Sequence, residues 1–408
     1  MQHQIPVETL GSAGHAMAQA VSSCVHCGFC LPACPTYRVL GEEMDSPRGR
    51  IVLMKEVLEG GLTLDEAAPH LDRCLGCLAC ESACPSGVRY RDLIEPFREK
   101  LVAGRPALAT RRLRGLLRVM ESPALFRLAA LAGAAARPFA SLVPAPLSTM
   151  LGLLPVGLPA PYLAPPFTPA RGPRRGRVAL MTGCVQSVLR PSITEAAGRV
   201  LAANGVDVVV PPGQGCCGAL ACHVGDRTRG AALARAHRAH FPADVDAVLA
   251  TAAGCGSAMK DDHQDGPPVL DVLEYLDQLG LVGAPRLAAP TPVAYQDACH
   301  LAHAQQVTSA PRRLLQAVAG LTLVPIADSG ICCGSAGLYN IEQPALATEL
   351  GARKAAALRG SGAALVATAN IGCLTQMEAS LTAEGGALPV RHVVELLAMA
   401  YRSAAGPQ

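Results

Sequence analysis

Eight cysteines in the first hundred residues stand in two runs with the spacing of iron–sulfur ligands. The runs read CVHCGFCLPACP from Cys24 and CLGCLACESACP from Cys74. Both fit C-x2-C-x2-C-x3-C-P, in which three thiolates bind one cluster and the fourth, before proline, ligates the other. Such centres transfer single electrons. The runs predict two [4Fe–4S] clusters, the first on Cys24, Cys27, Cys30 and Cys84 and the second on Cys74, Cys77, Cys80 and Cys34.

Zinc and disulfides are the alternatives for these cysteines. Zinc modules usually take two ligands from each of two Cys-x-x-Cys knuckles, which a triple run ending in Cys-Pro fits poorly. The chain opens without the apolar segment of a secretory signal. We therefore expect a cytoplasmic protein, in a reducing compartment where disulfides are rare and cysteines hold metal.

A second group of cysteines follows the ends of expected strands in the C-terminal half. One set is Cys184, Cys216, Cys217 and Cys255, and the other is Cys299, Cys332, Cys333 and Cys373. These cysteines could hold a further cluster, line a metal-free substrate or quinone crevice, or be structural residues at tight turns. Cys222 has no counterpart in the second set, and we interpret it as structural.

Three histidines lie close to these cysteines. His223 follows the first Cys-Cys-Gly, and His300 and His303 follow Cys299. Such side chains can hydrogen-bond a thiolate or protonate a quinone, but they are more often caps or satisfied loop residues. No G-x-G-x-x-G fingerprint is present, so the sequence indicates neither a flavin nor a nicotinamide site in this chain.

The elements expected around the N-terminal runs are helices. Residues 46–60 begin with Ser-Pro, repeat apolar residues at helical spacing and end in Gly60. A capping box of Thr63 and Glu66 predicts a second helix, and residues 91–102 predict a third. Residues 1–104 are therefore expected to form an α-helical ferredoxin-like domain with two cluster sites.

The C-terminal half is an internal duplication. Strand-like runs at 177–181, 206–210 and 246–251 each lead to a cysteine landmark, and runs at 293–295, 321–326 and 364–368 do the same. Alternation of such runs with Ala-rich helical stretches is typical of α/β units. Residues 173–285 and 286–408 are expected to be two α/β repeats, within an α+β multidomain chain. Ligands collect beyond the carboxyl ends of parallel strands, so both cysteine sets should face one crevice.

Residues 105–172 form a Pro/Ala-rich connector that opens with a basic amphipathic helix over 105–120. We expect this helix to pack on its own protein, with docking to a membrane surface or a partner as the alternative. Prolines interrupt the apolar stretch at 124–167, so no stretch is a convincing membrane span. Aromatic residues make up 3% of the chain and the net charge is +3, which argues against a nucleic-acid partner.

The motifs together resemble the glycolate oxidase iron–sulfur subunit family. The resemblance rests on the two cysteine runs with SPRGRI between them, and on GCVQSVL, GCCGAL, DACHLAHAQQ and CCGSAGLYN at positions 183, 215, 297 and 332. It covers nearly the whole chain. It implies an electron-transfer subunit of a glycolate dehydrogenase, working with an FAD-containing subunit, a second flavoprotein-like subunit and a quinone at the cytoplasmic face of the inner membrane.

Related families keep other substrates open. The iron–sulfur subunits of lactate and glycerol-3-phosphate dehydrogenases look similar, and so does a catalytic subunit of heterodisulfide reductase. In the last family each repeat ends in Cys-x-x-Cys and holds a non-cubane cluster. Here Cys255 is followed by Gly-Ser-Ala and Cys373 by Leu-Thr-Gln, so the final cysteine is missing from both repeats. That departure puts such clusters, and disulfide reduction, in doubt.

Overall fold

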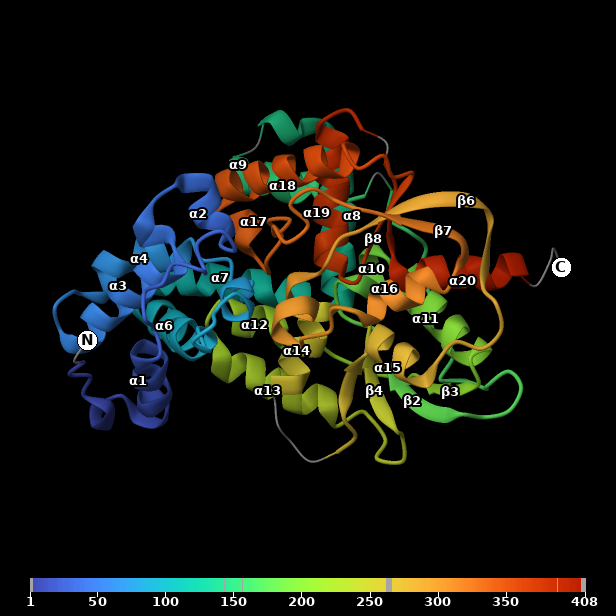
Figure 1. Cartoon of the computed structure of the whole chain (residues 1–408), viewed down its shortest axis with the longest axis horizontal. Helices are drawn as coiled ribbons and strands as arrows, with labels where there is room; N and C mark the ends of the chain where they lie inside the picture. The colour runs from blue at the N-terminus through green and yellow to red at the C-terminus, as the bar shows by residue number, and fades with distance from the viewer. Residues whose placement is uncertain (1–2, 143, 156, 262–265, 387, 405–408) are drawn as a thin grey trace.

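A computed structural model describes residues 3–142, 144–155, 157–261, 266–386 and 388–404. In Figure 1 the N-terminal helices, in blue, lie on one side of the molecule, and the two sheet-containing repeats lie on the other. The N-terminal helices are α1 (Gly14–Ser22), α2 (Pro35–Leu40), α3 (Pro47–Glu59), α4 (Leu64–Asp72), α5 (Ala79–Ser82) and α6 (Arg91–Gly104).

The predicted caps of the N-terminal helices are confirmed. Ser46 Oγ accepts a hydrogen bond from the Gly49 amide at 3.0 Å, and Gly60 ends α3 in the left-handed conformation. Thr63 and Glu66 form the capping box of α4. These helices enclose a small core that includes Met17, Leu71 and Phe97, each inaccessible to solvent. The cysteine loops are therefore held between capped, packed helices.

The connector is helical for most of its length. It contains α7 (Ala107–Glu121), α8 (Pro123–Ala136), the 3-10 helix η4 (Arg137–Leu142) and α9 (Ala145–Gly152). The expected basic helix is α7, which buries Leu113 and Leu117 and pairs Arg114 with Asp226 at 3.1 Å. One face of α7 thus packs on its own protein, as expected.

A search of the described residues for membrane spans finds no single helix of sufficient length and apolarity. Helix α7 and the stretch Pro123–Ala140 meet the length and composition test only as a pair, bent by 101° at the break between them.

The two repeats share a four-strand order, and the first sheet has one additional strand. In the first, β1 (Phe167–Thr168) lies antiparallel to β3 (Val206–Val209), and β2 (Gly176–Leu180), β4 (Ala247–Ala250) and β5 (Val269–Asp271) complete a sheet ordered β1-β3-β2-β4-β5. In the second, the order is β7-β6-β8-β9, which matches β3-β2-β4-β5 of the first, from β6 (Arg286–Tyr295), β7 (Ala319–Val324), β8 (Leu365–Thr368) and β9 (Val390–His392). All pairs except β1 with β3 are parallel. The duplication read from the sequence is thus present in the topology.

Helices pack around both sheets. The first repeat contains α10 (Gln186–Leu189), α11 (Pro191–Ala203), α12 (Ala219–His223), α13 (Arg227–Arg238), α14 (Ala253–Asp261) and α15 (Val272–Leu279). The second contains the π-helix η5 (His300–Ala304), α16 (Ala310–Gln316), α17 (Tyr339–Glu342), α18 (Pro344–Arg359), α19 (Ile371–Ala383) and α20 (Val393–Ala404). The expected α+β fold, with a helical N-terminal domain and two α/β repeats, is confirmed.

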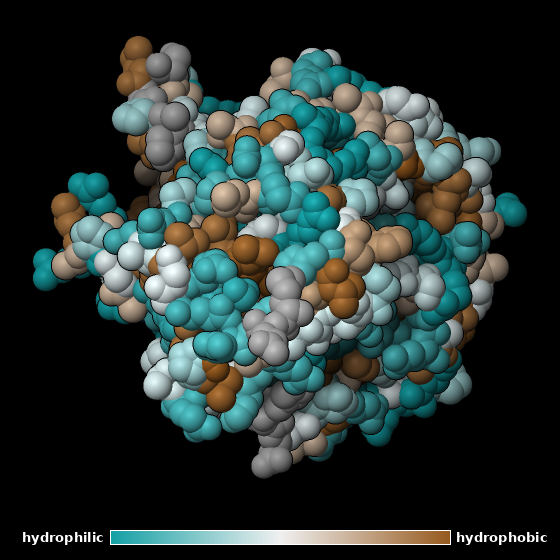
Figure 2. Space-filling view, turned by 60° about the vertical axis from the view of Figure 1, so that its left-hand side comes forward, coloured by the Kyte–Doolittle hydropathy of each residue, from teal (hydrophilic) through white to brown (hydrophobic). Residues whose placement is uncertain are grey.

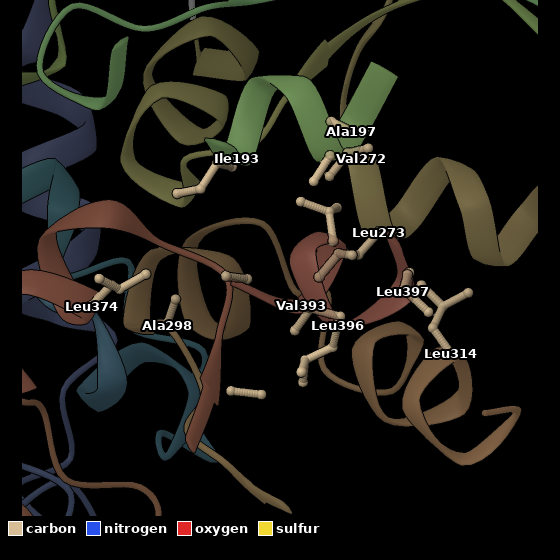
Figure 3. Packing of buried hydrophobic residues seen from close by; sticks show 14 of the residues in the cluster. Ile193, Ala197, Val272, Leu273, Ala298, Leu314, Leu374, Val393, Leu396 and Leu397 are labelled. Atoms are coloured by element: carbon tan, nitrogen blue, oxygen red, sulfur yellow. The ribbon is translucent and has the colours of Figure 1, made fainter. Parts of the chain in front are cut away.

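One hydrophobic core joins the two repeats. Figure 3 shows Ile193 and Ala197 of α11 in the same cluster as Leu396 and Leu397 of α20, with Leu314 of α16 beside Leu397. A buried polar contact crosses the same junction, because His392 Nε2 donates to the Thr251 carbonyl at 2.9 Å. The repeats are therefore packed as a unit, and this fixes the strand ends of one sheet relative to those of the other.

Candidate cysteine sites

The first predicted cluster site is a shallow pocket in the N-terminal domain. Its lining includes Cys24, Cys27, Cys30 and Cys84, the four predicted ligands, and also Cys80. Cys27 is exposed, and the side chains of Val25 and Phe29 next to it are 66% and 65% exposed. The Val88 amide donates to Cys84 Sγ at 3.4 Å. This site therefore lies at the surface, within reach of another molecule.

Most of the second predicted set is buried. Cys34, Cys74 and Cys77 are buried, and these three thiols act electrostatically on the half-buried Cys80. Cys34 comes from the start of α2, about forty residues before the other three, so the fold brings the fourth thiol to the second run. The two sets adjoin, because Cys80 also borders the first pocket.

Left-handed residues shape both cysteine loops in the same way. His26 and Gly28 have φ of 54° and 86°, and the equivalent positions in the second run, Gly76 and Leu78, have φ of 66° and 60°. Left-handed conformation is costly for His and Leu, so the surrounding structure must hold it. In the second run this conformation aims the Gly76 amide at Cys74 Sγ, 3.4 Å away. The loops thus form matching cradles of thiols and amides, which fits an iron–sulfur centre.

Positive charge surrounds the second set. Arg50 is 1% exposed, and its guanidinium donates to Thr36 Oγ1 at 3.1 Å and approaches Cys34 Sγ at 3.9 Å. Burial alone would raise the pKa of Cys74, but Arg50 and Arg98 outweigh it and lower that pKa. These arginines therefore favour negative charge on the Cys74 sulfur, whereas burial raises the pKa values of Cys77 and Cys80 well above the usual range.

Neither arginine was singled out from the sequence. Arg50 lies in SPRGRI between the two cysteine runs, and that motif was the available signal for it. Arg98 carried no such signal. It reaches the loop from α6, where it donates to the Cys74 carbonyl and, at 3.1 Å, to the His223 carbonyl.

The eight C-terminal cysteines all line one cavity of about 800 Å³. Within the first set, neighbouring thiols follow the order Cys184, Cys216, Cys217 and Cys255, with 3.6 Å between the sulfurs of the first two. The second set repeats that order with Cys299, Cys332, Cys333 and Cys373. The crevice expected beyond the strand ends is therefore present, and both repeats contribute to it. Cys222 lines the cavity as well.

Several thiols of the cavity are kept neutral by their surroundings. Neighbouring thiols and burial raise the pKa values of Cys217, Cys299 and Cys333 well above the usual range. The pKa of Cys216 is instead lowered to about 3, because hydrogen bonds from Cys184 and Cys217 favour its thiolate. Four clustered thiols in each set are a chemically suitable donor set for a thiophilic metal centre.

The cavity adjoins the buried N-terminal set. Cys77 packs against Cys332 in a small apolar cluster with Leu75 and Tyr339, and it interacts electrostatically with Cys299. On the other side, His223 Nε2 donates to the Leu75 carbonyl at 2.9 Å. The loop that holds Cys74 and Cys77 is thus clamped between the two repeats, and its Gly76 and Leu78 form part of the cavity wall.

The histidines have separate roles. His223 and His300 line the cavity with their rings 6.2 Å apart, and burial lowers their pKa values to about 3 and about 4, so both are neutral at pH 7. His303 instead contacts Ser82 Oγ at 2.9 Å. Two of the three histidines therefore supply neutral polar groups to the cavity, and the third joins two domains.

One wall of the cavity is apolar and comes from the connector. Phe126, Ala130 and Gly133 of α8 line it, and so do Leu151 of α9 and Leu154 just after that helix. Sequence reasoning did not assign these residues to a site, because nothing local distinguishes them from ordinary core residues. Across the described residues, no group of three or more His, Cys, Asp or Glu side chains could hold a single metal ion. A four-iron cube is larger than one ion, so this finding bears on zinc and not on a cluster.

Comparisons with known proteins agree with this organisation. A family model described as a 4Fe-4S dicluster domain matches residues 20–88, and one described as a cysteine-rich domain matches residues 178–260 and 293–378. The chain is 37% identical over 428 residues to the glycolate oxidase iron-sulfur subunit of Escherichia coli (strain K12), covering 98% of this chain and 99% of the relative.

Two further relatives match different shares of this chain. A probable glycolate oxidase iron-sulfur subunit of Bacillus subtilis (strain 168) is 36% identical over 416 residues, covering 92% of this chain and 93% of the relative. Lactate utilization protein A of an Exiguobacterium strain is 29% identical over 242 residues, covering 54% of this chain and 96% of the relative.

Proposed function

The chain belongs to the family of glycolate oxidase iron–sulfur subunits, and from this premise we propose that it relays electrons from a flavin subunit oxidising glycolate to glyoxylate towards a quinone. Its partners in this proposal are an FAD-containing subunit and a second flavoprotein-like subunit, in the cytoplasm at the inner face of the membrane. The observation that carries the proposal is the adjacency of three cysteine sites, from the exposed Cys27 to the buried cavity.

The residues that would hold the two [4Fe–4S] clusters are the two N-terminal sets. Clusters supply one-electron transfer, which is needed between a two-electron flavin and a quinone reduced in single steps. The first set is partly exposed, with Cys27 at the surface beside Val25 and Phe29, which suits contact with an electron donor. The second packs through Cys77 against Cys332, which lines the cavity. The protein thus separates donor and acceptor ends by its own packing.

The arginines near the second site act on its reduction potential. Positive charge close to a cluster favours its reduced, more negative state and raises its reduction potential. Arg50 and Arg98 both act on Cys74 in this way, whereas the half-buried Arg48 acts on Cys24 of the first set. A higher potential at the buried site would draw electrons inward, which is the direction the proposal requires.

The cavity is suited to a quinone. Such a molecule has an apolar ring and tail with polar oxygens, and ligand sites generally combine apolar walls with a few placed polar groups. Connector helices supply the apolar wall, and His223 and His300 supply the polar groups. The cysteine sets on the opposite wall could hold a further cluster, which would lie next to the same ligand.

Metal analysis of the anaerobically purified chain tests the proposal. Iron, acid-labile sulfide and zinc are counted per polypeptide, with EPR of the reduced sample, and two cubes require about eight irons. About eight irons and no zinc would support two clusters and a metal-free cavity, whereas clearly more iron would place a further cluster in the repeats. Zinc in place of iron would refute the electron relay.

The substrate is tested separately, because it is set by the flavin subunit. The reconstituted complex is assayed with glycolate, lactate and glycerol 3-phosphate, and glycolate is expected to give the highest kcat/KM. The similarity to lactate utilization protein A makes lactate the main competitor. Preferred oxidation of lactate would keep the relay and change the substrate.

A further inference from the structure

The connector presents an apolar surface that the fold leaves uncovered. Helix α8 is apolar on every side, with Arg127 as its one charged residue. Its inner face, with Phe126, Ala130 and Gly133, lines the cavity. Its outer face carries Leu125, Leu128 and Leu131, which are 44%, 66% and 50% exposed. A helix with apolar residues all round is normally buried on all sides, so the outer face lacks a covering.

The same surface extends beyond α8. Phe139 and Leu142 of η4 are 60% and 79% exposed, and Leu147 of α9 is 45% exposed. In Figure 2, by contrast, much of the visible face is hydrophilic, with hydrophobic residues in small separate patches. We define the connector surface as Leu125, Leu128, Leu131, Phe139, Leu142 and Leu147. Exposed apolar residues gathered in this way on one segment indicate an interaction site.

The charge of the segment identifies its partner. Residues 122–194 contain no Asp or Glu, and every charged residue among them is an arginine. The preceding helix α7 adds the exposed Arg111, Arg112 and Arg118. Exposed leucines and phenylalanine with arginines and without acids are the composition that binds an anionic lipid surface, where apolar side chains enter the interface and arginines meet headgroups.

We propose that the connector surface binds the anionic lipid of a membrane, with the outer face of α8 in the headgroup region. This inference rests on the proposed function, because it puts the cavity wall against the phase in which a quinone dissolves. Ala129, Ala132 and Ala136 line the cavity and are themselves exposed, so the cavity opens along the helix that contacts lipid. A lipid-soluble acceptor would then reach the cysteine sites without crossing water.

Vesicle flotation with the full chain, purified anaerobically, tests this surface. The probe is a vesicle of equal parts phosphatidylglycerol and phosphatidylcholine, compared with phosphatidylcholine alone. The variant carries Leu128→Glu and Leu131→Glu, two outward-facing residues that do not line the cavity. The control carries Val282→Glu and Met399→Glu, which make the same charge change at exposed positions, 45% and 37%, of the repeats. Iron content and visible absorption show that each variant is folded.

The wild-type chain should bind the anionic vesicles, more weakly at high salt and on the neutral vesicles. The α8 variant should lose about tenfold or more in binding, and the control should stay within about twofold. Equal binding by wild type and the α8 variant, or no binding by the wild type, would overturn the proposal. The proposal would also be overturned if the α8 variant still bound vesicles but no longer assembled with the flavin subunits. The connector surface would then be a subunit interface.

A second assay separates this inference from the relay itself. Glycolate-dependent reduction of a water-soluble dye by the assembled complex should be unchanged in the α8 variant, because electron transfer within the chain does not need lipid. Loss of dye reduction in the wild-type complex would refute the proposed function, whatever the vesicles show. Normal dye reduction without vesicle binding would refute only the membrane surface.

Discussion

The N-terminal domain and the repeats both gather cysteines, but they surround them with different charge. In the N-terminal domain Arg50 and Arg98 lower the pKa of Cys74. In the repeats, burial and neighbouring thiols raise the pKa values of Cys299 and Cys333 well above the usual range. In the first region the arginines favour a negative sulfur at Cys74, although burial raises the pKa values of Cys77 and Cys80. In the second, hydrogen bonds from other thiols lower the pKa of Cys216, and Cys299 and Cys333 would need a metal to become thiolates or stay neutral around a ligand.

The largest effect expected from this comparison is at the contact between the regions. Cys77→Ser should reduce glycolate-dependent quinone reduction at least about a thousandfold, because it removes a predicted ligand at a contact between an N-terminal thiol and the repeat thiols. The matched control is Cys222→Ser, a cavity residue outside both sets, which should change the rate little. The rate of glycolate-dependent quinone reduction is measured for complexes that contain each variant. Equal losses in the two variants would contradict the comparison.

The charge that distinguishes the N-terminal domain can be removed directly. Arg50→Met leaves Asp45 buried beside fewer positive partners, and this should cost about 3–5 kcal/mol of unfolding free energy. Arg48→Met, two residues earlier in the same helix, breaks a surface pair with Glu43 and should cost less than about 1 kcal/mol. Anaerobic denaturant titrations compare the two.

The same pair of variants also reports on the clusters. Arg50→Met should lower the reduction potential of the buried site, because a positive charge that favours the reduced state is gone. Potentiometric EPR would show this shift, and an unchanged potential would mean that Arg50 serves stability alone.

The repeats have their own pH sensitivity. His392 donates from Nε2 to Thr251 and accepts the Val394 amide at Nδ1, so it must be neutral, and burial lowers its pKa to about 4. A lowered folded pKa means that stability is present above pH 6.5 and is lost as the pH falls towards 4, on the order of 3 kcal/mol in all. His392→Gln should flatten this dependence in pH-dependent unfolding, and the exposed control His15→Gln should not.

The smallest expected difference separates the two cluster loops. A Cβ on Gly76 would lie 2.7 Å from Nη1 of Arg98, whose guanidinium donates to two carbonyls, whereas a Cβ on Gly28 would meet the end of the Arg48 side chain at 2.9 Å. Gly76→Ala should therefore cost about 2–3 kcal/mol and Gly28→Ala about 1 kcal/mol. Thermal unfolding under anaerobic conditions compares the stability of the two variants. A larger loss for Gly28→Ala would mean that the first loop is the more constrained.

The sequence by itself determined the features that depend on neighbouring residues. The cysteine spacing indicated the cluster sites, Ser46 and Thr63 marked helix starts, and the matched strand runs revealed the duplication, because local hydrogen bonds and side-chain alternation leave a readable pattern. The ligand assignment itself remains a prediction, although the fold brings Cys34 and Cys84 to the expected partners.

Only the tertiary structure decided what surrounds those residues. Arg98 reaches Cys74 from a helix beyond the second run, and both cysteine sets enter one cavity because the repeats share a core. Helix α8 carries no motif, yet it forms the cavity wall and leaves Leu128 and Leu131 exposed on the outside. These relations come from packing between segments far apart in the chain, and apolar side chains look alike in the sequence whether they face a core, a ligand or a membrane.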